Sequence, residues 1–137
     1  MDRTQLETII RQVLAEHLGG GVRAVKVPEL SITEEHRMNT GNPGDRVYTR
    51  DLFTLEQSPR LGVGIMEMRD TTFPWTLNYD EMDYVISGRL EIRCNGRTVS
   101  AGPGELIYIP KGSHIHFQTP TKTRYAYFVY PANWQEG

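Results

Sequence analysis

The chain has 137 residues and a formal net charge of -2, with 23% charged and 38% hydrophobic residues. This length suits one domain with one core, and the charge leaves no basic excess to neutralise the phosphates of a nucleic acid. The lone cysteine, Cys94, excludes an internal disulfide, and no apolar run approaches the roughly 20 residues that span a bilayer. We therefore expect a cytoplasmic protein that binds neither nucleic acid nor membrane.

The first 19 residues predict an amphipathic helix. Thr4 and Glu7 have the spacing of a capping box, and Gly19, Gly20 and Gly21 end the helical pattern. Apolar residues recur at the i, i+3, i+4 spacing of one helical face, at Leu6, Ile9, Ile10, Val13, Leu14 and Leu18. We interpret residues 20–23 as a glycine-rich linker and residues 24–137 as the main domain.

A helix of this length needs a surface on which to bury its apolar face. Residues 1–18 resemble the short encapsulation helices that lead enzymes into bacterial microcompartments, which implies a shell protein as partner of residues 1–19 and the microcompartment lumen as location. Packing on its own domain or on a dimer mate is an alternative that the sequence leaves open. A membrane surface is not favoured, because only Arg3 and Arg11 are basic.

The rest of the chain predicts short β-strands. Residues 23–33 carry Pro28 and favour an edge strand or an irregular extended segment, and 39–45 reads as a loop. Asn95 and Gly96 predict a two-residue hairpin. Runs rich in β-branched and aromatic residues, separated by turn residues, lie at 46–53, 61–68, 81–86, 89–94, 98–101, 105–109, 115–117 and 124–130. This spacing, without a second helix, predicts an all-β barrel or jelly roll.

Two segments make the barrel prediction specific. Glu81 lies seven residues before Gly88, and residues 104–112 have the pattern G-x5-P-x-G. Both resemble the paired motifs of cupins, whose fold is a double-stranded β-helix. The resemblance implies an all-β cupin barrel that follows the N-terminal helix.

The histidines of a metal-binding cupin are missing from the first motif. The corresponding positions fall within residues 74–77, Pro-Trp-Thr-Leu, and none of these side chains carries an imidazole. The histidine of the second motif would fall at Ile115, which His114 and His116 flank, so only a shift of strand register would turn a histidine inward. We therefore expect no bound metal, and a metal-dependent oxygenase or isomerase is the least favoured function.

Polar residues remain at the predicted mouth of the barrel. If Glu81 faces inward, Asp83 shares its face, because the side chains of a strand alternate. Two carboxylates in one pocket raise the pKa of one of them or share a cation, unless an arginine such as Arg93 or Arg124 neutralises them. We take Glu81, Asp83 and Tyr79 as candidate catalytic residues and Thr76 and Asn78 as candidate substrate-binding residues.

Four blocks, residues 73–81, 109–113, 119–121 and 130–134, resemble the EutQ family of ethanolamine utilisation proteins. The resemblance implies a microcompartment operon, a homodimer and an ATP-dependent acetate kinase activity, and hence Mg²⁺ and ATP. Under this resemblance Glu81 and Asp83 would serve as Mg²⁺ ligands or acid/base groups. The group near phosphate would be Lys111, Arg93 or the pair of His114 and His116.

The chain departs from common nucleotide-binding patterns, because it has no G-x-x-x-x-G-K-[ST] sequence and its glycine triplet follows a helix. Two functions therefore remain open at this point. One is an enzyme of the microcompartment lumen that uses a small-molecule substrate. The other is a non-catalytic assembly or binding module with a metal-free barrel.

Overall fold

The computed structural model describes residues 2–17 and 21–136, and it divides into two compact units, Met1–Leu30 and Ser31–Gly137. The first unit holds the helix α1 (Arg3–His17) and a short 3₁₀ helix, η1 (Val27–Glu29). Leu18, Gly19 and Gly20, which complete the predicted stripe and linker, lie outside the described residues. No described helix is both long enough and apolar enough to cross a membrane.

The helix α1 is capped two residues earlier than the capping box at Thr4 and Glu7 predicts. Asp2 Oδ1 accepts a hydrogen bond from the Gln5 amide at 2.7 Å, and Gln5 Oε1 accepts one from the Asp2 amide at 3.0 Å. Asp and Gln form the same reciprocal box, which places Thr4 inside the helix, where its carbonyl accepts from Thr8. The apolar residues Leu6, Ile9, Ile10 and Val13 are 42% to 58% exposed.

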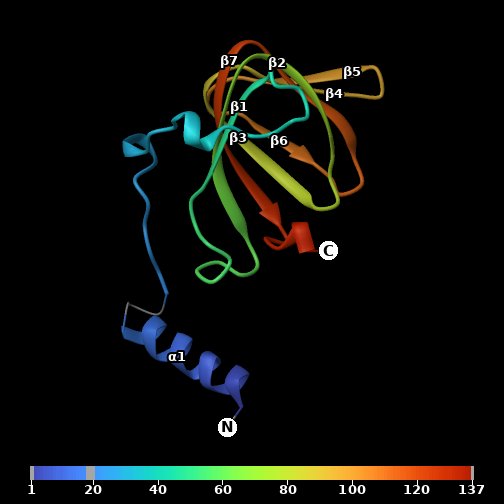
Figure 1. Ribbon diagram of the computed structural model, residues 1–137. Helices are drawn as coiled ribbons and strands as arrows, with labels where there is room; N and C mark the ends of the chain where they lie inside the picture. Colours follow the sequence, from blue (N-terminus) through green and yellow to red (C-terminus); the bar gives the residue numbers. More distant parts are fainter. Residues whose placement is uncertain (1, 18–20, 137) are drawn as a thin grey trace. The chain divides into compact units, whose positions relative to one another are not determined.

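The second unit is an all-β barrel, as the sequence predicts (Figure 1). Its strands form one sheet in the order β1-β2-β7-β3-β6, and β4 pairs with both β5 and β7. The strands are β1 (Arg46–Asp51), β2 (Gly62–Thr76), β3 (Asp80–Gly88), β4 (Leu90–Cys94), β5 (Arg97–Ala101), β6 (Leu106–Ile109) and β7 (His114–Tyr130), with 3₁₀ helices η2 (Glu34–His36) and η3 (Trp134–Glu136). The described part of residues 23–33 contains η1 and no strand.

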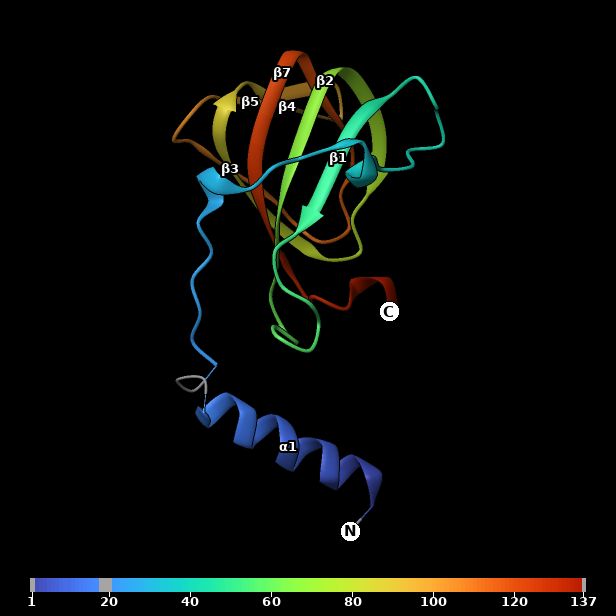
Figure 2. The same ribbon diagram turned by 60° about the vertical axis from the view of Figure 1, so that its left-hand side comes forward.

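Two long strands join the two layers of the barrel, and they run side by side in both views (Figures 1 and 2). The first half of β2 pairs with β1 and with residues 122–129 of β7. Its second half pairs with residues 114–119, which also contact β4. The sequence prediction that β2 ends near residue 68 and that β7 is two separate strands is therefore wrong.

Residues that usually end a strand, Asp70, Pro74 and Pro120, caused this error, because here the strands continue through them. The register of β2 on β7 shifts between Arg69 and Thr71, and Asp70 between them has φ 40°. Pro120 lies opposite this bulge in β7. Pro74 lies beyond the stretch that pairs with β1, so β2 is an edge strand there and its missing N–H breaks no second ladder.

Alternating side chains of both layers fill the barrel core. The largest fully buried side chains include Tyr125, Phe73, Ile65 and Met68. At Gly88 the backbones of β3 and β7 approach closely: φ is 77°, and an added Cβ would lie 2.1 Å from the carbonyl oxygen of Lys122. Only glycine fits this approach, which explains the glycine that ends the first cupin-like motif.

The outer face of β3, β6 and β7 carries large apolar side chains. Met82 pairs with Tyr108 on one side and Phe128 on the other, and Tyr84 pairs with Leu106. We call this the β3-β6-β7 face; its members, Met82, Tyr84, Leu106, Tyr108, Phe128 and Tyr130, are 42% to 63% exposed.

Candidate functional site

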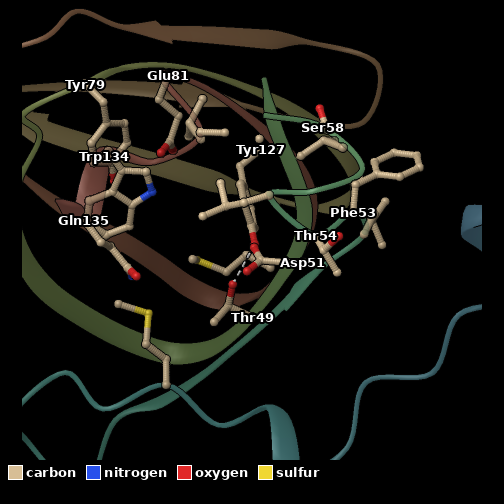
Figure 3. A pocket seen from close by; sticks show the side chains of 18 of the residues that line it. Thr49, Asp51, Phe53, Thr54, Ser58, Tyr79, Glu81, Tyr127, Trp134 and Gln135 are labelled. Carbon is tan, nitrogen blue, oxygen red and sulfur yellow. Dashed lines mark hydrogen bonds between the residues drawn. The ribbon is translucent and has the colours of Figure 1, made fainter. Parts of the chain in front are cut away.

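The barrel encloses a cavity of about 570 Å³ (Figure 3). Its lining combines aromatic rings with a few polar groups. The rings are Phe53, Phe73, Trp75, Tyr79, Phe117, Tyr127 and Trp134, and the polar side chains include Asn39, Thr49, Asp51, Thr54, Gln57, Ser58, Glu81 and Gln135. This composition is typical of a small-molecule pocket.

Glu81 lines the cavity from β3, and Asp83 lies behind it on the same face of the strand. Their side chains are 5% and 0% exposed. Burial raises the pKa of Glu81, and it raises the pKa of Asp83 well above its ordinary value, with a further increase from the charge of Glu81. Neither carboxyl oxygen of Asp83 has a hydrogen-bond partner among the described residues.

Among the residues that the structure describes, no arginine is paired with these two carboxyl groups. Arg124 Nη1 bonds Glu67 Oε1 at 2.8 Å, between neighbouring positions of β7 and β2. Arg93 is exposed on β4. The two carboxyl groups therefore share an environment that favours one retained proton or a bound cation.

Three rings that contact one another, Trp75, Tyr79 and Trp134, line one side of the cavity, and we call them the aromatic wall. Trp75 Nε1 donates to the Tyr79 hydroxyl at 2.8 Å, and the Tyr79 and Trp134 ring centroids are 4.6 Å apart. Asn78 Nδ2 donates to the Trp134 carbonyl at 3.3 Å. Asn78 is not part of the cavity lining. Its role there is indirect, because it helps to position Trp134, which does line the cavity.

A second polar group occupies another side of the cavity (Figure 3). The Tyr127 hydroxyl donates to Asp51 Oδ1 at 2.5 Å and lies 3.0 Å from Thr49 Oγ1. Burial raises the pKa of Tyr127, and so does its bond to Asp51. The sequence analysis did not select these residues, although alternation from the buried Val47 would have placed Thr49 and Asp51 on the inner face.

Gly64 makes room for this second polar group. It pairs with Tyr127 across β2 and β7, and an added Cβ would lie 2.0 Å from the Tyr127 hydroxyl oxygen and 2.7 Å from the Arg50 carbonyl oxygen. The position of the phenol therefore depends on the missing side chain at residue 64.

Four further residues selected from the sequence lie outside the cavity lining, as Asn78 does: Thr76, Lys111, His114 and His116. Thr76 Oγ1 and His114 Nδ1 are hydrogen-bonded to each other at 2.9 Å, and Lys111 is exposed in the turn before β7, where its amide donates to Asp80 Oδ1. Ile115 is buried, so the histidines on either side of it are on the opposite face of β7. The structure thus brings Tyr79, Glu81 and Asp83 together and leaves these four apart.

The donor set does not fit a transition metal. Trp75, Leu77 and Ile115 occupy the positions where the cupin motifs would place inward imidazoles. Among the described residues, no group of three or more His, Cys, Asp or Glu side chains is arranged to hold a metal ion. The adjacent carboxyl groups of Glu81 and Asp83, of which the Asp83 oxygens have no hydrogen-bond partner among the described residues, instead fit Mg²⁺, which binds proteins through one or two carboxylates and completes its shell with phosphates and water.

Comparisons with known proteins agree with this architecture. The family described as "Ethanolamine utilisation protein EutQ" matches residues 1–136. A relative named "Acetate kinase EutQ" from Clostridioides difficile (strain 630) is 51% identical over 98% of this chain and 94% of its own length. A protein of the same name from Salmonella typhimurium is 42% identical over 84% of this chain, which spans 50% of that longer protein.

Solved structures agree as well. The Clostridium difficile EutQ protein has a TM-score of 0.81 at 60% identity, covering 83% of each chain. A cupin domain of Schizosaccharomyces pombe Cnp3, at 13% identity, has a TM-score of 0.58, covering 82% of this chain and 77% of its own, and so shares the fold. With a family match over almost its entire length and this structural likeness, the chain belongs to the EutQ family of ethanolamine utilisation proteins.

Proposed function

We propose that this protein transfers a phosphoryl group from ATP to acetate in the barrel cavity. The observation that carries the proposal is the buried carboxyl pair of Glu81 and Asp83, with the Asp83 oxygens unpartnered among the described residues, in a chain 51% identical to a protein named acetate kinase. Such pairs bind a cation, or one of the two carboxyl groups has a raised pKa and retains its proton.

The reaction needs positioning more than acid/base chemistry. An oxygen of the acetate carboxylate bonds to the terminal phosphorus of ATP while the bond from that phosphorus to the bridging oxygen breaks, which leaves acetyl phosphate and ADP. When bound, Mg²⁺ supplies neutralisation of the phosphate charge, and Glu81 and Asp83 are the residues that would hold it.

Tyr79 has a defined part in this scheme. Its hydroxyl already accepts a hydrogen bond from Trp75, so its own proton is available to a substrate oxygen. Burial raises the pKa of Tyr79, which keeps that proton in place at neutral pH. Tyr79 therefore orients acetate or phosphate by donation.

The test is acetyl phosphate formation by purified protein with Mg²⁺, ATP and acetate, trapped as the hydroxamate. We expect Glu81→Gln to lower kcat at least about 100-fold, because a neutral amide binds Mg²⁺ far more weakly than a carboxylate does. Glu91→Gln is the matched control, since Glu91 lies on β4 outside the cavity and bonds Ser100 and Gln118. Equal turnover by the two variants, or none by the unmodified protein, would reject the proposal.

A second function, docking to a microcompartment shell protein, is supported by α1. Leu6, Ile9, Ile10 and Val13 are exposed on a helix whose length makes it marginal without a surface to lie on. We expect Ile9→Glu with Val13→Glu to abolish co-purification with shell protein, whereas Arg3→Glu, on the polar face, retains it. Unchanged co-purification of the double variant would contradict this role.

A further inference from the structure

We propose that the cavity is a binding site for a small organic ammonium ion, held between the Glu81 carboxyl group and the aromatic wall. The charge of the lining is the first reason. Two carboxyl groups, Glu81 and Asp51, line the cavity, with Asp83 buried behind Glu81, and the described lining residues include no lysine, arginine or histidine. Such a pocket attracts a cation.

The carboxyl groups are not equivalent. Asp51 already accepts a hydrogen bond from Tyr127. Asp83 has no such donor: it is fully buried, and no described residue bonds its oxygens, while Glu81, 5% exposed, lines the cavity in front of it. Unpaired carboxyl oxygens beside a cavity are stabilised by a positively charged ligand.

The aromatic rings indicate an organic rather than a metallic cation. Trp75 and Trp134 meet at 77° with centroids 6.1 Å apart, and Tyr79 lies 4.6 Å from Trp134. Tryptophan and tyrosine faces attract an ammonium group through the negative potential of the ring, and rings at right angles present it on more than one side. Without the phosphates of ATP to complete its shell, a metal ion would find too few oxygen or nitrogen ligands among the described residues here.

The polar groups on the other side of the cavity suit the rest of such a ligand. Asp51, Thr49 and Tyr127 form a hydrogen-bonded cluster that can exchange hydrogen bonds with a hydroxyl group (Figure 3). An amino alcohol carries both an ammonium and a hydroxyl group. The cavity volume, about 570 Å³, holds a molecule of this size together with water.

The experiment uses ligand pairs that differ in charge and little in shape: choline against 3,3-dimethylbutan-1-ol, and ethanolamine against ethylene glycol. Binding is measured by calorimetry and by tryptophan fluorescence, without ATP, acetate or Mg²⁺. At least one ammonium compound is expected to bind at least about tenfold more tightly than its neutral partner and to alter the tryptophan emission. Equal affinity within both pairs, or no saturable binding of either cation, overturns the proposal.

Variants then locate the site. Glu81→Gln is expected to weaken ammonium binding at least about tenfold, while Glu91→Gln binds as the unmodified protein does. An equal loss in both variants places the ligand elsewhere and overturns the proposal. If Glu81→Gln does not fold, Thr49→Val, which removes a hydroxyl of the second polar group, is expected to weaken ethanolamine binding more than ethylammonium binding, because only ethanolamine carries a hydroxyl group. An absence of any such effect also overturns it.

This inference does not depend on phosphoryl transfer, and the two are separable. An ammonium ion in the cavity occupies the region that would hold Mg²⁺ and phosphate, so it is expected to inhibit acetyl phosphate formation competitively. Ammonium binding without kinase activity would support the ammonium site and reject the phosphotransferase function. Kinase activity without ammonium binding would support the phosphotransferase function and reject the ammonium site.

Discussion

Asp83 is a fully buried carboxyl group without a hydrogen-bond partner among the described residues, and this has a consequence for stability. Burial raises its pKa, and the nearby Glu81 raises it further, while the phenols of Tyr79 and Tyr125 on adjacent segments also interact with it. The folded chain therefore retains a proton that the unfolded chain releases. Its stabilising contribution is complete below the ordinary carboxyl pKa and is lost as pH rises through the raised value.

We predict that Asp83→Asn flattens the pH dependence of unfolding, because an amide does not ionise. The free energy of unfolding, measured in urea between about pH 4 and about pH 8, should fall less in the variant than in the unmodified protein, by about 1.4 kcal/mol for each unit of pKa elevation removed. Asp80→Asn, at an exposed carboxyl, is the control. Parallel curves for Asp83→Asn and the unmodified protein would contradict the assignment.

The sequence predicts part of this site because strand alternation is a strong rule. It places Asp83 on the face of Glu81, and both are buried as expected. The same rule applied to residues 46–53 would have found Thr49 and Asp51. It cannot say that a segment far along the chain, at Trp134, lies against Tyr79, since that proximity arises only from the folded topology.

At the scale of the element, the junction of β3 and β7 depends on Gly88. We predict that Gly88→Ala destabilises the fold by about 2 kcal/mol or more, because the methyl group meets the Lys122 carbonyl and the backbone has positive φ. Gly96 is a matched control: it also has φ 77°, but nothing lies within 4 Å of an added Cβ. Gly96→Ala should cost only about 1 kcal/mol in urea unfolding, and equal losses would contradict the steric argument.

Element boundaries were harder to predict than element types. The Asn95-Gly96 hairpin is confirmed, because its conformation is determined by two adjacent residues. The lengths of β2 and β7 were not predictable, since Asp70, Pro74 and Pro120 are breakers in an isolated strand. Only the pairing partners of each stretch show that a bulge and an edge accommodate them.

At the scale of the whole molecule, the β3-β6-β7 face exposes six large apolar side chains next to β6, which ends the sheet order. We propose that a second copy of the chain covers it. Half-exposed aromatic and aliphatic side chains of this number offer on the order of 600 Å² per chain, which approaches the roughly 800 Å² per partner of a stable interface.

Tyr108→Glu is therefore expected to convert a dimer to a monomer in sedimentation velocity, because a charge at the centre of an apolar interface is costly to bury. Val99→Glu, at an exposed apolar residue of β5 outside this face, should leave the dimer intact. A monomeric unmodified protein, or a Tyr108→Glu dimer of unchanged affinity, would remove the proposal.

The glycine beneath the Tyr127 phenol has a consequence for comparing family members. In a relative that keeps the tyrosine, any larger residue at position 64 would displace the phenol from this position and reduce the volume of the cavity. The residue aligned with position 64 therefore separates homologues that retain the full cavity from homologues in which a side chain fills part of it.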